Sequence, residues 1–248
     1  MHRFYLPPEN CRGPTLRLDG REAHHALHVL RLKRGEPVTV LDGAGGKFFC
    51  TVENAAKVSL TLAVHEKKST AHLPCSITLL VAVPKAKIIE SIIQKAVELG
   101  AHRIVPLLTE RVVSQLDEEG AESKREKWRQ VAIEAIKQCG AAWLPKVEAP
   151  QTISDFLPRG ERIELSFVGS LQTARRHPRE WILEFQKQHG RLPHSAAVWI
   201  GPEGDFTLAE LQAIEAAGAK PITLGNLTLR VETAAIYCLS FLHYELQH

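Results

Sequence analysis

The sequence predicts an α/β domain with a mainly parallel sheet, preceded by a small domain of short β-strands. Residues 1–70 hold short β-prone runs separated by turn-forming residues, whereas residues 71–248 alternate continuous apolar runs with segments of helical periodicity. Alternating strands and helices are typical of a parallel sheet, and regularly spaced short strands are typical of a small barrel. We therefore expect two domains, at 1–70 and 71–248.

Four β-prone runs define the first domain, and we expect strands at 15–18, 37–41, 47–53 and 59–64. The glycine-rich segment 42–46 predicts a hairpin turn, with phosphate binding as the lesser alternative. Apolar residues at helical spacing predict one short helix over 21–32. The polar stretch 65–74 is expected to be a linker.

The second domain alternates in a regular order. We expect strands at 77–83, 104–108, 164–168, 196–200 and 221–224. We expect helices at 85–99, 121–139 and 178–188, one that begins after Thr207, and a last one at 232–246. Thr207 and Glu210 have the spacing of a capping box, and Gly100 is a stop signal after the first of these helices.

Composition restricts the class of protein. The hydrophobic fraction of 44% is ordinary for a globular chain of 248 residues. The five cysteines are scattered and form no C-x-x-C pair, so they predict reduced thiols in a cytoplasmic protein rather than a metal or redox motif. No apolar run approaches the ~20 residues of a membrane span, and no signal peptide is recognisable. We expect neither a membrane segment nor a bound metal.

Positive charge gathers near the start of the chain. The net charge is only +3, but residues 1–35 carry seven arginines and lysines against three acids. We predict that Arg3, Arg31, Lys33 and Arg34 contact RNA phosphates, with Arg31 the strongest candidate. The alternative is a basic surface that is merely solvated.

Glycine-containing turns follow three predicted strands of the second domain, at 168–170, 200–204 and 224–226. Ligands of open α/β sheets bind beyond the carboxyl ends of the strands, where glycine allows close approach of the backbone. We therefore expect a pocket at these turns, although plain turns are the alternative. Neither a P-loop nor a dinucleotide fingerprint is present, which argues against a nicotinamide-dependent dehydrogenase.

Two segments in this region carry a family resemblance. Residues 198–204 read V-W-I-G-P-E-G and residues 224–234 read L-G-N-L-T-L-R-V-E-T-A. The pair resembles the signature of the ribosomal RNA small subunit methyltransferase E family, of the SPOUT class. The resemblance extends to 24–31, 94–100 and 138–140 with Pro145, so it spans nearly the whole chain.

The chain departs from the resembled family at three places. Asp205 stands where the family usually has a glycine, and Lys137 stands where a glutamate is expected. Residues 141–143 read Ala-Ala-Trp in a region where the family has an arginine.

The resemblance implies a PUA-like β-barrel that binds RNA, followed by a SPOUT-type α/β domain whose last segments form a trefoil knot. It implies S-adenosylmethionine as cofactor, a homodimer through the C-terminal domain, and methylation of uridine N3 in 16S ribosomal RNA of the small subunit. The alternatives are a non-catalytic RNA-binding or ribosome-assembly protein with this fold, and a methyltransferase for a different RNA nucleotide.

The resemblance and the strand-end turns together give the expected cofactor-binding residues. These are Val168, Gly169, Ile200, Gly201, Pro202, Glu203, Gly204, Leu224, Gly225, Asn226, Leu229, Arg230, Thr233 and Ala234. Arg230 and Glu203 are the expected catalytic residues. The Arg230 cation could stabilise a uridine anion or bind a phosphate, and its alternative is a structural ion pair with Glu203 or Glu232. Glu203 could bind polar parts of the cofactor or hold its own loop, and a role as general base is less favoured.

Overall fold

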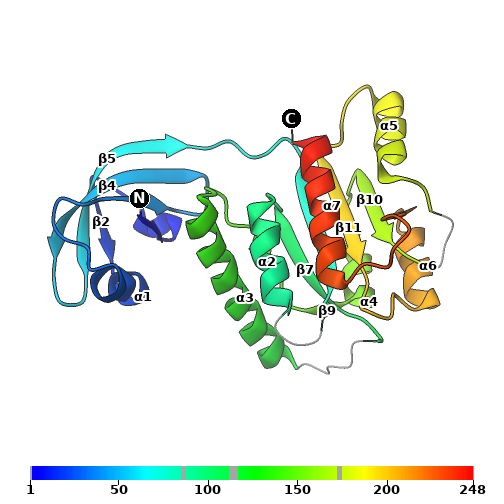
Figure 1. Cartoon of the computed structure of the whole chain (residues 1–248), viewed down its shortest axis with the longest axis horizontal. Coiled ribbons are helices and arrows are strands. Elements are labelled where there is room, and N and C mark those ends of the chain that lie inside the picture. The colour runs from blue at the N-terminus through cyan, green and yellow to red at the C-terminus, as the bar shows by residue number, and fades with distance from the viewer. Residues whose placement is uncertain (1, 85–87, 112–116, 172–174, 248) are drawn as a thin grey trace. The chain divides into compact units, whose positions relative to one another are not determined.

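The computed structural model describes residues 2–84, 88–111, 117–171 and 175–247, which form two compact units (Figure 1). The first unit comprises Met1–His72 together with Ile133–Leu144. The second comprises Leu73–Ala132 together with Pro145–His248. A segment far along the chain therefore completes the N-terminal unit.

The first unit is built on one five-stranded sheet. Its strands are β1 (His2–Tyr5), β2 (Thr15–Leu18), β3 (Pro37–Leu41), β4 (Gly46–Ala55) and β5 (Leu60–Ser69), in the spatial order β1-β3-β4-β5-β2. Only β1 and β3 run parallel, and the other pairs are antiparallel. Alternate side chains of these strands, such as Phe4, Leu16 and Leu62, are buried in one apolar cluster. This period of two is what a half-buried strand requires.

The sheet differs from the prediction at two places. Strand β1 was not predicted, because its four residues include His2 and Arg3 and lack an apolar alternation. The expected linker 65–74 is wrong over its first half, because β5 continues to Ser69, which lies opposite Gly46 of β4. Pairing with a long neighbouring strand has outweighed the polar composition of that segment.

The predicted helix of the first unit is shorter than expected. It consists of α1 (Gly20–His24) and a π-helical turn, η2 (His25–Val29), in which the Leu30 N–H donates to His25 O at 3.0 Å. Arg31 follows with φ 54°, in the left-handed region, and this conformation ends the helix before Leu32. Single π-turns are rare and occur often at functional sites.

The second unit contains a wholly parallel sheet. Its strands are β6 (Ser76–Ala82), β7 (Arg103–Leu108), β8 (Lys146–Val147), β9 (Gln151–Thr152), β10 (Leu165–Gly169), β11 (Ser195–Ile200) and β12 (Lys220–Ile222). The order is β12-β10-β11-β6-β7-β8, with β9 also paired to β7. The predicted parallel sheet is confirmed, although β12 ends at Ile222 rather than at Leu224.

Helices cover both faces of this sheet (Figure 1). They are α2 (Ile88–Glu98), α4 (Ile153–Phe156), α5 (Pro178–His189), α6 (Leu208–Ala216) and α7 (Val231–Leu246). Helix α3 (Glu118–Cys139) runs from the second unit into the first, and two 3-10 turns, η1 (Pro8–Asn10) and η3 (Leu157–Arg159), lie elsewhere in the chain. Helices α4 and α6 pack on the face that carries Leu80 and Trp199, whereas α2 and α7 lie side by side on the other. Residues 85–87 of the predicted first helix lie outside the described residues.

The predicted capping box of α6 is confirmed. The Glu210 N–H donates to Thr207 Oγ1 at 3.3 Å, and the Thr207 N–H donates to Glu210 Oε2 at 2.8 Å. Glu210 Oε1 also accepts from the N–H of Glu110, just beyond β7, at 2.9 Å. One buried carboxylate thus starts α6 and ties it to the neighbouring loop.

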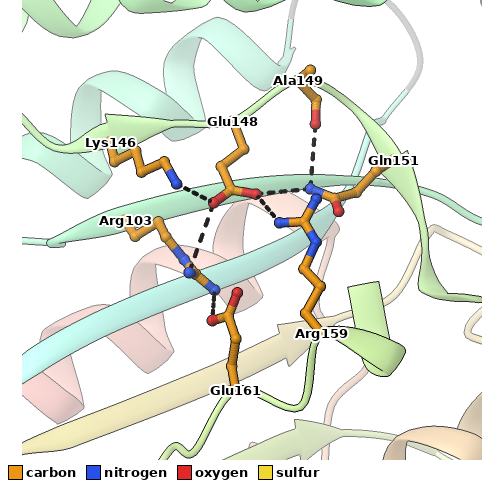
Figure 2. A network of polar contacts seen from close by, with 7 residues as sticks. All are labelled: Arg103, Lys146, Glu148, Ala149, Gln151, Arg159 and Glu161. Atoms are coloured by element: carbon orange, nitrogen blue, oxygen red, sulfur yellow. Dashed lines mark hydrogen bonds and ion pairs between the residues drawn. The ribbon is translucent and has the colours of Figure 1, made fainter. Parts of the chain in front are cut away.

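A buried carboxylate also organises the edge of the sheet (Figure 2). Glu148 lies 3.0 Å from Lys146 Nζ and 2.9 Å from Arg159 Nη1, and accepts from Gln151 Nε2 at 2.9 Å. Arg103 is 3.7 Å away and is also paired with Glu161. Burial raises the pKa of Glu148, but hydrogen bonds from Gln151, Lys146 and Arg159 and the Arg103 charge lower it more, so the net pKa falls below its ordinary value.

Replacing Glu148 by glutamine is expected to lower the free energy of unfolding at pH 7 by about 3 kcal/mol, because it leaves Arg103 and Arg159 without their shared counter-charge. Since the folded-state pKa of Glu148 is depressed, its contribution is present above the unfolded pKa of ~4.3 and is lost as pH falls through the folded value. The difference between the two proteins in urea denaturation should therefore shrink in acid.

The exposed pair Lys95–Glu98, with its atoms 2.9 Å apart, provides the matched control. Glu98→Gln should cost at most ~0.5 kcal/mol at any pH. If Glu148→Gln is as mild as this control at pH 7, the carboxylate does not organise the sheet edge.

Candidate functional site

An open hollow lies at the carboxyl ends of β10, β11 and β12, beside the first turn of α7, and encloses about 600 Å³ when the solvent at its mouth is included. This is where parallel α/β sheets bind ligands. Its walls are formed by the ends of these three strands, the loops that follow them and the first turn of α7. The lining residues are Gly169, Ser170, Leu171, Arg175, Ile200, Gly201, Pro202, Glu203, Asp205, Ile222, Leu224, Gly225, Leu227, Thr228, Leu229, Val231 and Ala234.

The pocket brings most of the expected cofactor residues together. Those that line it are Gly169, Ile200, Gly201, Pro202, Glu203, Leu224, Gly225, Leu229 and Ala234. Expected residues outside its lining are Val168, Gly204, Asn226, Arg230 and Thr233. Val168 instead packs in the apolar cluster on the face of α4 and α6. Successive side chains of a strand point to opposite faces of the sheet, and Val168 precedes the last residue of β10.

Arg230 occupies the boundary between the pocket wall and α7. It is the N-cap residue of the helix, with an extended backbone (φ −67°, ψ 156°) and an exposed side chain. Both of its chain neighbours, Leu229 and Val231, line the pocket. Among the salt bridges found between described residues, none joins Arg230 to Glu203 or Glu232, so the alternative of a structural ion pair is not observed.

Glu203 lies in a tight turn at the mouth of the pocket. The Asp205 N–H donates to Pro202 O at 2.9 Å and closes the turn, and the side chain of Glu203 is exposed. The Arg111 guanidinium donates to the carbonyl of Gly204 and lies 3.4 Å from the carbonyl of Asp205. The turn is thus held through its backbone, which leaves the Glu203 carboxylate accessible.

Eight lining residues are absent from the expected cofactor set, namely Ser170, Leu171, Arg175, Asp205, Ile222, Leu227, Thr228 and Val231. Four of these, Ile222, Leu227, Thr228 and Val231, lie inside the predicted strand 221–224 or the segment 224–234 that carries the resemblance. Ser170 and Leu171 directly follow β10, and Asp205 directly follows the predicted segment 200–204, so extending each turn by one or two residues would have found them. Arg175 is separated from its strand by residues outside the described part of the chain, and no local pattern marks it. Its Nη1 donates to Ser170 O at 3.2 Å.

The lining suits a cofactor with an apolar ring system and separated charges. Leu171 and Leu227 line the pocket yet are 56% and 79% exposed, so an occupant would remove apolar surface from water. Glu203 and Asp205 offer negative charge, and Arg175 offers a guanidinium for a carboxylate. S-adenosylmethionine has an adenine ring, a sulfonium, an ammonium and a carboxylate, and the residues present fit it.

The candidate RNA-binding residues belong to the first unit. Arg31, Lys33 and Arg34 are exposed and follow the π-helical turn. Arg3 differs from them, because its Nη1 donates to the carbonyls of Lys137 and Gln138 at 3.1 and 2.8 Å, at the last turn of α3. Arg3 therefore pairs with carbonyls at the carboxyl end of α3 that have no partner within the helix. These hydrogen bonds compete with the binding of RNA phosphates.

Two of the three departures from the resembled family, Lys137 and residues 141–143, form hydrogen bonds or ion pairs within the first unit. Lys137, whose side chain is 9% exposed, places its Nζ 2.8 Å from Glu22 Oε1. Trp143 Nε1 donates to Thr70 O at 2.9 Å, and the Ala142 carbonyl accepts from the N–H of Gly45 at 3.0 Å. Neither departure lines the pocket; of the three, only Asp205 does.

Metal ligands and membrane spans were searched only in the described residues. No cluster of three or more histidines, cysteines or acids is close enough to hold a metal ion there. None of the helices in those parts of the chain has both the length and the apolar character that crossing a membrane requires. Burial raises the pKa of the thiols of Cys75 and Cys238 to about 12, which makes them poor nucleophiles.

Comparisons with known proteins agree with this arrangement. An RNA methyltransferase domain family matches residues 71–243, and an RNA methyltransferase PUA domain family matches residues 18–64. The ribosomal RNA small subunit methyltransferase E of Synechocystis sp. is 31% identical over 96% of this chain and 76% of its own length. The chain belongs to the ribosomal RNA small subunit methyltransferase E family. A Bacillus subtilis member is 30% identical over 94% of this chain and 91% of its own.

Solved structures of similar proteins have the same fold. A Legionella pneumophila protein described as a methyltransferase, in complex with S-adenosylmethionine, has a TM-score of 0.87 and 30% identity over 98% of this chain and 96% of its own. A family member from Neisseria gonorrhoeae bound to S-adenosylmethionine has a TM-score of 0.83 and 27% identity, with the same coverage. The family resemblance and the two-part α/β fold with a PUA domain are confirmed, whereas the trefoil knot stays a prediction.

Proposed function

We propose that this protein is an S-adenosylmethionine-dependent methyltransferase that modifies N3 of a uridine in the 16S ribosomal RNA of the small subunit. The observation that supports it most is the pocket at the carboxyl ends of β10, β11 and β12. Both signature segments meet there in a chain whose relatives have been solved with S-adenosylmethionine. The target atom rests on the family resemblance.

The pocket residues have distinct tasks in this proposal. The turns that contain Gly201 and Gly225 would let backbone groups approach a flat ring of the cofactor, and Leu227 would offer it apolar surface. Glu203 would place negative charge near the positive parts of the cofactor. S-adenosylmethionine supplies an electrophilic methyl group on a sulfonium. Because the transfer requires an in-line approach, holding both reactants in position can provide much of the rate enhancement.

Arg230 is the proposed catalytic cation. The N3 atom of uracil carries a proton and becomes a nucleophile when that proton leaves, with negative charge spreading over the ring. Both chain neighbours of Arg230 line the pocket, and from this position its guanidinium would stabilise the anion, or the adjoining phosphate, through charge-assisted hydrogen bonds. Glu203 is the second catalytic candidate, as the group that would orient the cofactor or accept the proton.

We propose that the PUA unit binds the RNA through Arg31, Lys33 and Arg34, whose exposed charges would make affinity depend steeply on salt. We further propose a cytoplasmic homodimer that pairs through the C-terminal domain. Helix α7 offers the exposed aromatic residues Tyr237 and Tyr244, at 47% and 71% exposure. Exposed aromatic side chains at helical spacing are common in protein interfaces.

The test uses the full-length protein in two steps. Calorimetric titration with S-adenosylmethionine comes first, followed by transfer of a tritiated methyl group to small ribosomal subunits that lack uridine-N3 methylation. Cofactor binding with transfer to N3 of one uridine would establish the proposal. Binding followed by transfer to another nucleotide would retain the enzyme class and refute the target. No binding would favour a non-catalytic assembly protein.

A further inference from the structure

Asp205 has an unusual backbone conformation in the pocket wall. Its φ is 63°, in the left-handed region that is disfavoured for residues with a side chain and open to glycine. At this φ, aspartate is less stable than glycine unless its side chain forms compensating contacts. We therefore expect such contacts from the Asp205 carboxylate.

The carboxylate connects two loops of the pocket. Its Oδ2 atom accepts from the N–H of Leu171 at 3.0 Å and lies 3.4 Å from Ser170 Oγ. Its Oδ1 atom accepts from the N–H of Phe206 at 2.8 Å. The loop after β11 is therefore joined through one side chain to the loop after β10, across 34 positions of sequence.

The segment that receives this carboxylate is itself part of the pocket. Ser170 is only 5% exposed, and its carbonyl accepts from Arg175 Nη1 at 3.2 Å. Leu171 next to it presents an apolar side chain at the pocket. Asp205 on one side and Arg175 on the other thus fix the position of this short wall.

The packing around the carboxylate leaves little freedom. A methyl group on Gly201 would lie 3.3 Å from Asp205 Oδ1, 3.1 Å from Phe206 N and 3.2 Å from the Phe206 ring. Arg111 binds the backbone carbonyls of the same loop. The Asp205 carboxylate is therefore confined between the glycine of its own loop and the wall that it holds.

We infer that Asp205 is a positioning residue of the cofactor site, whose carboxylate holds the Ser170–Leu171 wall against the loop of Gly201–Asp205. This rests on the proposed function, since it takes S-adenosylmethionine as the occupant. Because this wall is already held in place, the protein loses less conformational entropy when it binds the cofactor. The Asp205 carboxylate thus joins two loops of the pocket through a side chain whose backbone φ favours glycine.

The experiment compares Asp205→Gly and Asp205→Asn with the unsubstituted protein. Glycine adopts the left-handed backbone freely and removes the carboxylate, so the chain should fold while its dissociation constant for S-adenosylmethionine rises about tenfold in calorimetry. KM for the cofactor should rise similarly, whereas kcat at saturating cofactor stays within about twofold. Asparagine keeps an acceptor oxygen and tolerates the backbone, and should restore affinity to within about threefold.

A purely structural role would give a different pattern. Asp155→Asn is the matched control, because Asp155 Oδ2 also accepts a backbone N–H, that of Thr152 at 3.3 Å, and does not line the pocket. It should lower the melting temperature without changing cofactor affinity. Affinity of Asp205→Gly within twofold of the unsubstituted protein, or a fall in kcat with unchanged KM, would refute the positioning role alone. Failure of the unsubstituted protein to bind would refute the proposed function as well.

Discussion

Replacing Arg230 by alanine is expected to lower kcat for methyl transfer by about 100-fold or more, with cofactor affinity changed by less than about threefold. Removing a preorganised donor that faces developing negative charge typically costs this much in rate. The side chain forms no capping hydrogen bond at the start of α7, so its loss should not unfold the helix. Steady-state kinetics with saturating cofactor and small subunits measures the change.

The matched comparison is Arg230→Lys. Lysine keeps the charge but not the planar pair of donors, so kcat should lie between those of the unsubstituted protein and the alanine variant. Arg162→Ala removes an exposed arginine that does not line the pocket and should change nothing. Turnover of Arg230→Ala within threefold of normal would remove Arg230 from the catalytic residues.

Local sequence predicted the elements whose signals are contained within a few residues. The capping box of α6 could be read from Thr207 and Glu210, and buried parallel strands such as β6 and β11 appear as continuous apolar runs. Strands β8 and β9 have two residues each and exist only because β7 pairs with them. No periodicity can be read from two residues, so tertiary pairing alone determines them.

The residues of the site also divide into those that local sequence marks and those that it does not. Glycines after strands marked the two main loops, because a turn and close backbone approach both depend on glycine locally. The task of Asp205 could not be read from the sequence, because its carboxylate contacts Ser170 and Leu171, which belong to another loop. Contacts between separate loops leave no pattern in a single sequence. Arg3 shows the converse, since its charge suggested RNA while its guanidinium serves the end of α3.

Gly201→Val should reduce affinity for S-adenosylmethionine about 30-fold or more. Its first carbon alone would lie 3.1–3.3 Å from Phe206 and Asp205, closer than ordinary contacts, so the loop must shift. Overpacking of this kind costs about 1–3 kcal/mol, and every 1.4 kcal/mol of it that acts on binding is a tenfold loss. Calorimetry measures the loss, and Gly201→Ala should give a smaller one because it adds a single carbon.

A control is needed to show that the loss of cofactor affinity comes from the pocket and not from a general loss of stability. Ala196→Val overpacks the other end of β11, where the alanine is fully buried, and should lower the melting temperature without changing the dissociation constant. If the shift of Gly201→Ala acts through the Asp205 carboxylate, its effect on affinity should shrink in the Asp205→Gly background, because the two changes share one contact. Unchanged affinity in Gly201→Val would mean that the cofactor binds elsewhere, and additive effects in the double variant would mean that the glycine acts through Phe206 instead.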